Sequence, residues 1–367
     1  MSARHTELLK KLLYYSGYTS LHEFISAPSE NRLLILMYHD VVTESEQLAH
    51  WYSSDTPNTS QLEALIVAMK RHYRVITVED AVLEILNTGK IQTKSVALTF
   101  DDGYVGTHSL LYPLLRKHDI PATIYLPTNW IDGKVSPWWL LLNQYVDECS
   151  IDSHRIAGVE KIIAGFKVNV TWLAKQPNKF KAVLRDQLGG ILMKMEDKVR
   201  DQVMHDLRAT LIGDSPLLQR EQLVLNWTQI KEMAAYGIRF GAHSCSHRNL
   251  SFLDLEAADM EIRESKRVIQ QRLGVEAVGF AYPYGYDVNG YRRLRPLFEK
   301  HDYLYACTSW WGHVDAGCDR YLLARTCLAQ TNSTAVFARV LGLEYCTKQW
   351  PRPFGLEEWP LHTKSSD

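Results

Sequence analysis

The sequence has no excess of basic residues, no paired cysteine motif and no long apolar run. Its 41 Lys and Arg residues stand against 42 Asp and Glu residues, which gives a formal net charge of −1. Proteins that depend on binding polyanions usually carry a basic excess, so the composition gives no support to nucleic acid as a ligand. The six cysteines contain no C-x-x-C pair, which argues against a disulfide framework and a structural zinc knot.

Signals that direct a chain into or across a membrane are also lacking. No run approaches the ~20 apolar residues that span a bilayer. The leucine-rich stretch 8–13 is interrupted by Lys10 and Lys11, so we do not expect a signal peptide. We therefore expect a cytoplasmic protein. Tyr14 and Tyr15 extend this stretch and leave open a peripheral contact with the inner membrane surface, although such helices more often dock on their own domain.

An ordinary globular composition, 46% hydrophobic and 23% charged over 367 residues, allows two or three structural units. Short apolar runs bounded by turns predict strands at Leu33–Tyr38, Arg74–Thr77, Val96–Phe100, Ala122–Leu126, Ile238–Ala242, Val278–Tyr282 and Tyr303–Thr308. Segments with helical apolar spacing separate most of them. Continuous apolar strands alternating with helices predict an α/β fold, a closed or nearly closed parallel barrel covered on both faces.

One interval interrupts this alternation. No clear strand lies between about Asn129 and Asn226, but Lys179–Leu188 and Met193–Leu211 have amphipathic helical patterns. Because a structureless loop of ~100 residues is implausible inside a compact domain, we expect a large helical insertion. Its four tryptophans can pack its own core, the favoured interpretation, or form sugar-stacking surfaces above the barrel; they are Trp130, Trp138, Trp139 and Trp172.

The boundaries of the parts follow from these patterns. We expect an N-terminal helical segment over 1–31, a barrel over 32–128 and 227–345, a helical insertion or cap over 129–226, and an irregular C-terminal tail over 346–367. The tail is rich in Pro and Trp and then polar, as terminal segments outside a core often are.

Polar residues able to do chemistry follow four of the predicted strands. One strand ends in His39, another in Asp101-Asp102-Gly103, a third in His243 with His247 after it, and a fourth in the turn Tyr282–Gly285. In β/α barrels the functional groups collect at the carboxyl ends of the strands. We therefore expect these four segments to converge on one site.

The types and spacing of these residues predict a metal site with a free base. Adjacent residues leaving a strand point in opposite directions, so one of Asp101 and Asp102 can bind a metal while the other stays free. His243 and His247 are four apart and can converge. Two histidines and one carboxylate form a three-ligand set that leaves positions open, as in a catalytic metal site. The alternatives are an ordinary Asp-Gly turn and two unrelated exposed histidines.

Other strand-end residues carry weaker signals. His39 can line a pocket or simply pack, and the sequence favours neither. The segment Tyr282-Pro-Tyr-Gly285 can shape a pocket wall, or form a rigid turn without any chemistry.

At these residues the sequence resembles the polysaccharide deacetylase (NodB-homology) family, in its Met-Tyr-His-x-Val-containing type. Four motifs occur in the family's order: Met37-Tyr-His39-x-Val41, Thr99-Phe-Asp-Asp-Gly-Tyr104, His243-Ser-x-Ser-His247 and Tyr282-Pro-Tyr-Gly285. The resemblance covers about 32–128 and 227–330. It implies a deformed (β/α)7-type barrel with a large helical insertion, and metal-dependent removal of acetyl groups from N-acetylated sugars.

The resemblance also implies roles for individual residues. Asp101 matches the family's catalytic base, and the backbone N–H near Tyr104 matches its oxyanion donor. The metal ligands match Asp102, His243 and His247. The implied cofactor is a divalent metal, with Zn²⁺ expected ahead of Co²⁺, Ni²⁺ or Mn²⁺.

The sequence departs from the fuller family pattern in places. Ala281 stands where many members have an arginine that steadies the base, and Arg325 is our candidate to supply that charge. The later family motifs are missing, so the general acid stays open between His39 and His313. We expect the substrate to be contacted by Tyr282, Tyr284, Trp311 and His313.

The resulting functional hypothesis is a hydrolase of cell-envelope polysaccharide biosynthesis. It would remove acetyl groups from N-acetylhexosamine units of a glycan or a glycan precursor, the latter lipid-linked. The alternative is a catalytically impaired glycan-binding or assembly protein on the same barrel, motivated by Ala281 at the position of the family's arginine. Retention of Asp101 favours the enzyme, because a binder needs no free base beside the metal. The sequence leaves the sugar, its linkage and the oligomeric state undetermined.

Overall fold

The fold is described from a computed structural model. The described residues are 32–45, 56–134, 136–150, 152–164, 180–193, 195–217 and 223–327. All of them belong to one compact unit, Ser29–Gln330. The expected N-terminal helical segment 1–31 and the C-terminal tail 346–367 lie outside the described residues, as does Trp172.

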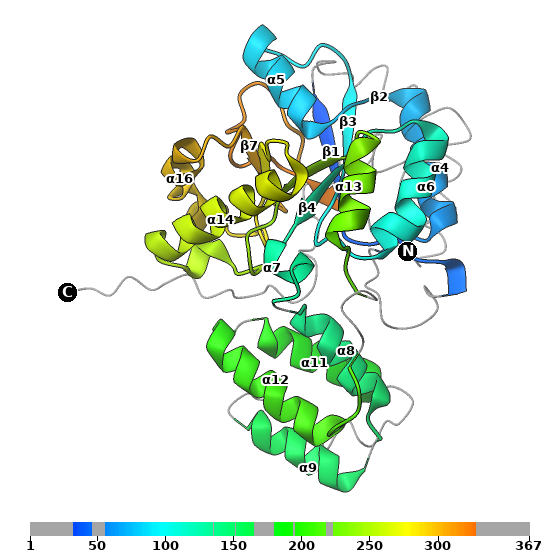
Figure 1. The fold of residues 1–367 in the computed structure, drawn as a ribbon, viewed down its shortest axis with the longest axis vertical. Coiled ribbons are helices and arrows are strands. Elements are labelled where there is room, and N and C mark those ends of the chain that lie inside the picture. The colour runs from blue at the N-terminus through cyan, green and yellow to red at the C-terminus, as the bar shows by residue number, and fades with distance from the viewer. Residues whose placement is uncertain are drawn as a thin grey trace, which may run out of the picture. The chain divides into compact units, whose positions relative to one another are not determined.

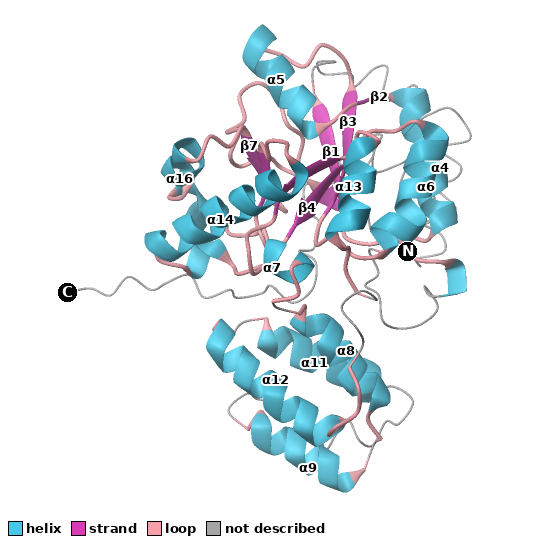
Figure 2. Ribbon diagram, in the orientation of Figure 1, coloured by secondary structure: helices cyan, strands magenta, loops and turns pink. Residues whose placement is uncertain are grey.

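The described residues form a parallel sheet of eight strands in the order β7-β6-β5-β4-β3-β1-β8, with β2 paired to β3 beside this path. Figure 2 shows these strands at the centre of the helices. The strands are β1 (Leu33–Tyr38), β2 (Arg74–Val75), β3 (Ser95–Phe100), β4 (Thr123–Leu126), β5 (Arg239–Ala242), β6 (Gly279–Ala281), β7 (Tyr305–Cys307) and β8 (Thr326–Cys327). The seven predicted strands are thus confirmed: β1 has the predicted bounds, β3 begins one residue earlier, and the other five are shorter. Strand β8 is an additional strand that the sequence pattern did not indicate.

The ends of the sheet approach each other through the segment that precedes β8. Cys307 of β7 forms a parallel bridge with Leu323, and three residues later Thr326 pairs with Leu36 of β1. This short connection links the two edges, so the sheet is a deformed, nearly closed barrel. The predicted barrel architecture is confirmed.

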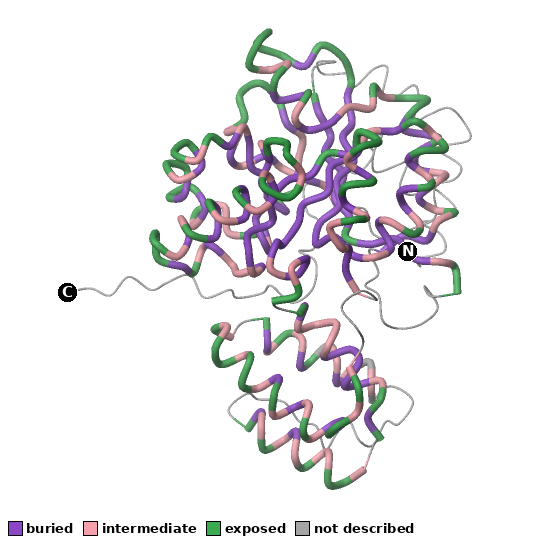
Figure 3. The backbone as a smooth tube through the Cα atoms, viewed as in Figure 1, coloured by how far each residue is buried: buried purple, intermediate pink, exposed green. Residues whose placement is uncertain are grey.

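The strands are buried because their residues are apolar on both faces. Every residue of β1, β3 and β4 is buried, and the central strands are the most continuously buried part of the chain (Figure 3). Inside the barrel, Leu33, Ile35 and Ala97 pack with Tyr125 and Tyr305. These strands accordingly lack the alternation of polar and apolar residues that is typical of a sheet with one solvent-exposed face.

Helices surround the barrel (Figure 1). They are α4 (Thr59–His72), α5 (Val78–Thr88), a π-helical turn (Thr107–Leu111) leading into α6 (Tyr112–His118), α13 (Trp227–Ala235), the 3₁₀ turn Leu250–Phe252, α14 (Leu255–Leu273), α15 (Val288–Arg292) and α16 (Arg295–Lys300). Helix α14 is capped at both ends, since Asp254 accepts a hydrogen bond from the Ala257 N–H and Gly274 ends the helix with φ +69°.

The predicted insertion is helical. It contains α7 (Thr128–Ile131), α8 (Trp138–Glu148), α9 (Ser153–Ile162), α11 (Phe180–Leu192) and α12 (Asp197–Leu211). Helices α8, α9, α11 and α12 share an apolar core that includes Leu142, Val146, Leu188 and Leu207. No helix among the described residues combines the length and the apolar character that crossing a membrane requires.

Candidate active site

Asp101 and Asp102 leave the end of β3 in opposite directions. The Asp101 N–H still pairs with the Tyr38 carbonyl oxygen of β1 at 2.8 Å, and the chain then turns tightly, with the Gly103 N–H donating to the Asp101 oxygen at 2.9 Å. Asp102 has φ +72° and Gly103 has φ +63°. A Cβ at Gly103 would lie 2.7 Å from the buried Leu126 side chain and would displace it, and together with the positive φ this favours glycine at the turn.

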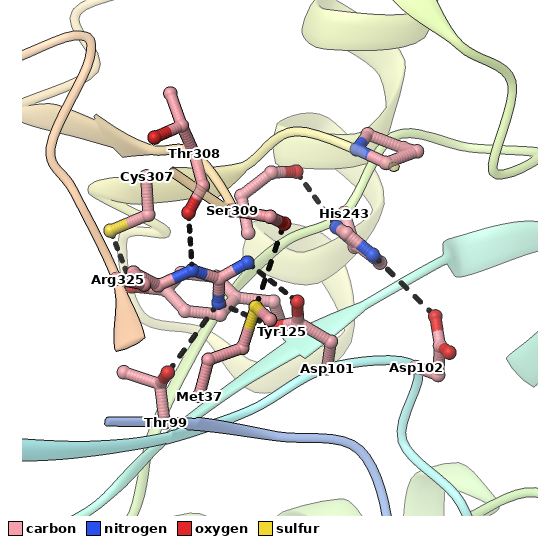
Figure 4. Close-up of polar contacts among 12 residues, drawn as sticks. Met37, Thr99, Asp101, Asp102, Tyr125, His243, Cys307, Thr308, Ser309 and Arg325 are labelled. Carbon is pink, nitrogen blue, oxygen red and sulfur yellow. Dashed lines mark hydrogen bonds and ion pairs between the residues drawn. The ribbon is translucent and has the colours of Figure 1, made fainter. Parts of the chain in front are cut away.

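The turn sends the Asp102 carboxylate toward His243 (Figure 4). His243 and His247 both follow β5. Asp102 Oδ1 lies 3.5 Å from His243 Nε2 and 3.3 Å from His247 Nε2. One ligand atom from each of the three residues lies within 4.8 Å of the others, and all three side chains are buried. The three metal ligands expected from the sequence are therefore brought together by the fold.

The hydrogen bonding of His243 shows that this cluster fits a cation. Its Nδ1 lies 2.7 Å from the Ala281 carbonyl oxygen, which can only accept, so Nδ1 carries the proton and neutral His243 presents a lone pair at Nε2. That lone pair faces Asp102 Oδ1, which is buried and has no hydrogen-bond partner among the described residues. A cation between two buried acceptors that face each other would stabilise both, and a ligating histidine typically donates its other ring N–H in this way.

The pKa shifts in the cluster have the same origin. Burial, reinforced by Asp101, raises the pKa of Asp102 well above its usual value. Burial lowers the pKa of His243 to about 4, and burial with the neighbouring His243 and His39 lowers that of His247. Each shift arises because the charged form of the side chain is buried away from water and has too little opposite charge nearby. A bound divalent cation would supply that opposite charge for the Asp102 carboxylate.

Asp101 points the other way and is held by Arg325. The guanidinium donates from Nη1 to Oδ1 at 2.7 Å and from Nη2 to Oδ2 at 2.6 Å, and both side chains are almost fully buried. Arg325 is itself fixed by its Nε–H, which donates to the Thr308 carbonyl oxygen at 2.8 Å. Burial acts to raise the pKa of Asp101, but Arg325 and His243 together lower it below its usual value. The charge expected from Arg325 is therefore present at Asp101.

Three aromatic rings enclose His247. The ring centroids of Trp130, Trp139 and Tyr284 lie 4.9, 5.1 and 5.0 Å from that of His247. Trp138, in contrast, packs against the core of the insertion. The favoured interpretation, that the tryptophans pack the insertion, therefore fits Trp138 but is wrong for Trp130 and Trp139, because these two lie against the candidate metal ligand.

Tyr104 lies beside the same carboxylate. Its hydroxyl accepts a hydrogen bond from the Trp139 indole N–H at 2.7 Å, and its proximity to Asp102 acts to lower the pKa of that carboxyl, against the larger effect of burial. The Val105 N–H donates to the Leu223 carbonyl oxygen, and the Leu225 N–H donates to the Gly103 carbonyl oxygen. Tyr104 and Val224, which lie between these two bonds, therefore form a non-hydrogen-bonded antiparallel pair. The backbone N–H of Tyr104 consequently points away from Val224, as an oxyanion donor would require.

The other predicted residues divide into two groups. His39 is exposed at the end of β1 and is close enough to influence the pKa values of Asp101, His243 and His247. Tyr284 contacts His247, as described. The structure does not bring Tyr282 or His313 to the cluster.

Tyr282 and His313 are corrections to the expected substrate contacts. Tyr282 is 1% exposed, stacks on Tyr291 at 4.1 Å and donates to the Tyr321 carbonyl oxygen, so it packs and anchors a turn. Beside His313, Val314 pairs with Leu33 at the start of β1, and this is the opposite end of the strand from the carboxylates.

Exposed aromatic residues lie near the turn that carries Tyr284. Trp311 is 46% and Trp310 53% exposed. The Trp310 indole N–H donates to the Tyr286 carbonyl oxygen at 2.5 Å, and Ser309 pairs with Gly285 through its backbone N–H. Trp310 was not among the expected site residues, although it lies in the same Trp-Trp pair as Trp311.

Sequence reasoning also missed Asp40 and Glu261. Asp40 is buried, and its charge contributes to the raised pKa values of Asp102 and Tyr104. Its place in the segment Met37–Val41 was the available signal. Glu261 contacts the loop between His243 and His247, and a carboxylate on the apolar face of α14 was the corresponding signal.

Comparison with known families agrees with this geometry. Residues 88–157 and 204–305 match the sequence model of the family described as polysaccharide deacetylase. The matched segments contain Asp101, Asp102, His243 and His247, whereas His39 and Arg325 lie outside them. The predicted resemblance to this family is therefore confirmed.

Individual relatives are more distant. The putative polysaccharide deacetylase YxkH of Bacillus subtilis is 30% identical over 104 residues, which are 28% of this chain and 34% of that protein. The chain thus spans about a third of the length of this curated relative.

Solved structures share the fold. The Streptococcus pyogenes deacetylase PplD in complex with acetate aligns with a TM-score of 0.54 and 18% identity over 85% of this chain and 99% of that one. A de-N-acetylase from Aggregatibacter actinomycetemcomitans aligns with a TM-score of 0.51 and 17% identity over 83% and 99%.

Proposed function

We propose that this chain is a metal-dependent hydrolase that removes acetyl groups from N-acetylated sugar units. The observation that carries the proposal is that the neighbouring carboxylates of Asp101 and Asp102 have different partners. Asp102 faces His243 and His247, while Asp101 is held by Arg325 and stays outside that set. A protein that only bound a metal or a glycan would have no use for a second, separately oriented carboxylate.

The metal we propose is Zn²⁺, held by Asp102, His243 and His247. Nitrogen and oxygen donors in a three-residue set are typical of catalytic zinc, and Co²⁺, Ni²⁺ or Mn²⁺ can use the same donors. When bound, such an ion supplies Lewis acidity that polarises an acetamide carbonyl and lowers the pKa of water.

The chain's own residues would carry the proton transfers. Asp101 is ionised at neutral pH because Arg325 lowers its pKa, so it can accept a proton from the attacking water. The backbone N–H of Tyr104 would stabilise negative charge on the former carbonyl oxygen. His39, exposed at the rim and close to Asp101, is the remaining candidate to protonate the departing sugar amine.

The substrate we propose is an N-acetylhexosamine unit of a glycan or of a lipid-linked glycan precursor. Exposed Trp310 and Trp311 and the half-buried Tyr284 provide aromatic faces near the site, and such faces are suited to the apolar faces of sugar rings. A cytoplasmic location with peripheral contact at the inner membrane surface belongs to the same proposal. Flotation with liposomes tests that contact, by comparing the full chain with one that begins at residue 31.

Acetate release tests the activity. The purified full-length protein, loaded with Zn²⁺ or Co²⁺, is incubated with N-acetylglucosamine oligomers and with lipid-linked N-acetylhexosamine precursors. We expect acetate from at least one substrate, and a loss of about 10²–10⁴-fold in Asp101→Asn with the metal content unchanged. Glycan binding without acetate release, from protein with a filled metal site, would instead support the non-catalytic alternative.

A further inference from the structure

The loop that joins the two candidate metal-binding histidines is held by one buried carboxylate from α14. Glu261 Oε2 accepts hydrogen bonds from the Cys245 N–H at 2.8 Å and the Ser246 N–H at 3.0 Å, and Oε1 accepts from the Ser246 hydroxyl at 2.6 Å. Glu261 is 2% exposed. All three of these donors come from the loop, so the carboxylate and the loop satisfy each other.

This loop has a backbone that needs support. Ser244 has φ +61° and His247 has φ +60°, a left-handed conformation that costs free energy in residues other than glycine. The Ser244 hydroxyl accepts from the His247 N–H at 2.9 Å, which closes the turn from inside. Glu261 accepts from the two successive N–H groups of Cys245 and Ser246 in the same loop. The Ser244 and Glu261 hydrogen bonds together fix the direction in which His247 leaves the loop.

The two histidines are anchored differently. His243 follows β5 directly and donates from its own ring to the Ala281 carbonyl oxygen. His247 Nδ1 is buried, and no residue in the described part of the chain forms a hydrogen bond with it. A ligating histidine usually has its ring oriented by a hydrogen bond at the second nitrogen. Because His247 lacks this bond, its position depends on the loop backbone and on the aromatic rings around it.

We propose that Glu261 is the positioning residue for His247, and that it presents this histidine to the metal by fixing the backbone of residues 245–246. The inference rests on the proposed metal-dependent function and deepens it. Glu261 does not touch the metal position or a substrate. It acts through Cys245 and Ser246, and its removal would leave His243 and Asp102 in place while His247 loses its fixed direction.

Metal affinity measured without any substrate tests the proposal. The full-length protein is freed of metal, and Zn²⁺ binding is followed by competition with a chromophoric chelator. We expect Glu261→Ala to weaken binding by about 10–100-fold, the usual effect of removing a group that orients a ligand. Glu261→Gln should recover much of the affinity, because the amide oxygen can still accept from both N–H groups. Glu264→Gln, three residues along the same helix and paired with Arg263 and Arg267, is the matched control and should bind like wild type.

The visible spectrum of Co²⁺-loaded protein distinguishes a positioning role from a general loss of stability. We expect Glu261→Ala to change the band positions and intensities, since one histidine ligand has moved, and Glu261→Gln to resemble wild type. Should Glu261→Ala fail to fold, Ser246→Ala removes one of the three hydrogen bonds and should weaken Zn²⁺ binding by a smaller factor.

The outcomes separate this inference from the function on which it rests. A folded Glu261→Ala protein with wild-type Zn²⁺ affinity and Co²⁺ spectrum would overturn the role of Glu261. Wild-type protein that binds neither ion would overturn the proposed function itself. Tight metal binding that depends on Glu261, in a protein that releases no acetate, would retain the positioning role and reject the deacetylase.

Discussion

Arg325 holds both carboxylate oxygens of Asp101, at 2.7 and 2.6 Å, across a separation of 224 residues in the chain. The guanidinium has no exposed surface, and Asp101 is 3% exposed. In such surroundings each charge depends on the other, because neither can recover its hydration. The pair therefore matters for the stability of the barrel as well as for the orientation of the proposed base.

Breaking this pair from one side should be costly. We expect Arg325→Gln to lower the free energy of unfolding by about 3–5 kcal/mol, since it leaves a buried carboxylate without a partner. The double variant with Asp101→Asn should be less destabilised than the sum of the two single variants. Denaturant unfolding of all four proteins measures the coupling, and simple additivity would contradict a direct interaction.

Removal of the metal should abolish activity reversibly. We expect elemental analysis to find about one divalent ion per chain and a chelator to eliminate acetate release, with recovery after Zn²⁺ or Co²⁺ is added back. Because the folded state binds the ion and the unfolded state lacks the site, the melting temperature should rise with metal concentration. His247→Ala should lose this rise, and a metal-dependent rise that persists in that variant would place the ion elsewhere.

His39 and His313 offer a matched comparison for the general acid. His39 lies close to Asp101, whereas His313 lies by the start of β1, next to the pair formed by Val314 and Leu33. We expect His39→Gln to lower kcat by about 10²-fold or more, with a smaller effect on KM. His313→Gln should leave both nearly unchanged. An equal loss in the two variants would reject this assignment.

Asp259 on α14 should make the fold more stable at neutral than at acid pH. It accepts hydrogen bonds from Lys300 Nζ at 2.9 Å and His301 Nε2 at 2.8 Å. Burial acts to raise its pKa, but these partners lower it below the usual value. A lowered pKa in the folded state gives stability that is present above the unfolded pKa of about 3.9 and lost as the pH falls through the folded pKa.

The test compares Asp259→Asn with wild type by denaturant unfolding at pH 6 and pH 3. The variant should be less stable at pH 6, and the difference should shrink at pH 3. Asp201→Asn, at an exposed position of α12, serves as the control. A difference that stays constant between the two pH values would contradict the contribution of the ionised Asp259.

Much of the barrel could be predicted because its strands are continuous apolar runs that end in polar residues. His39, Asp101 and His243 each directly follow such a run, so the shared position at the carboxyl ends predicted that they meet. The strand β8 could not be predicted in this way. It has two residues, Thr326–Cys327, and it is held by pairing with β1 rather than by a pattern of its own.

The surroundings of the site were less accessible to sequence reasoning. Trp139 and Glu261 lie on helices, where periodicity indicates a buried face but not what that face covers. The prediction that Tyr282 contacts substrate was wrong for a related reason, because the presence of a tyrosine in a motif does not tell whether its ring faces the pocket or the core. These contacts depend on how distant elements pack, which the spacing of residues along one element does not record.

The position of Arg325 in the sequence also has a consequence for how barrels of this kind are classified as active or inactive enzymes. A motif search that requires an arginine before the proline of Tyr282-Pro-Tyr-Gly285 would find Ala281 there and would classify the chain as inactive. The positive charge instead comes from Arg325, which directly precedes β8, the strand that pairs with β1. Whether a chain of this fold has an active site is therefore judged better from the residue that neutralises the buried carboxylate in the structure than from the residues of any single sequence motif.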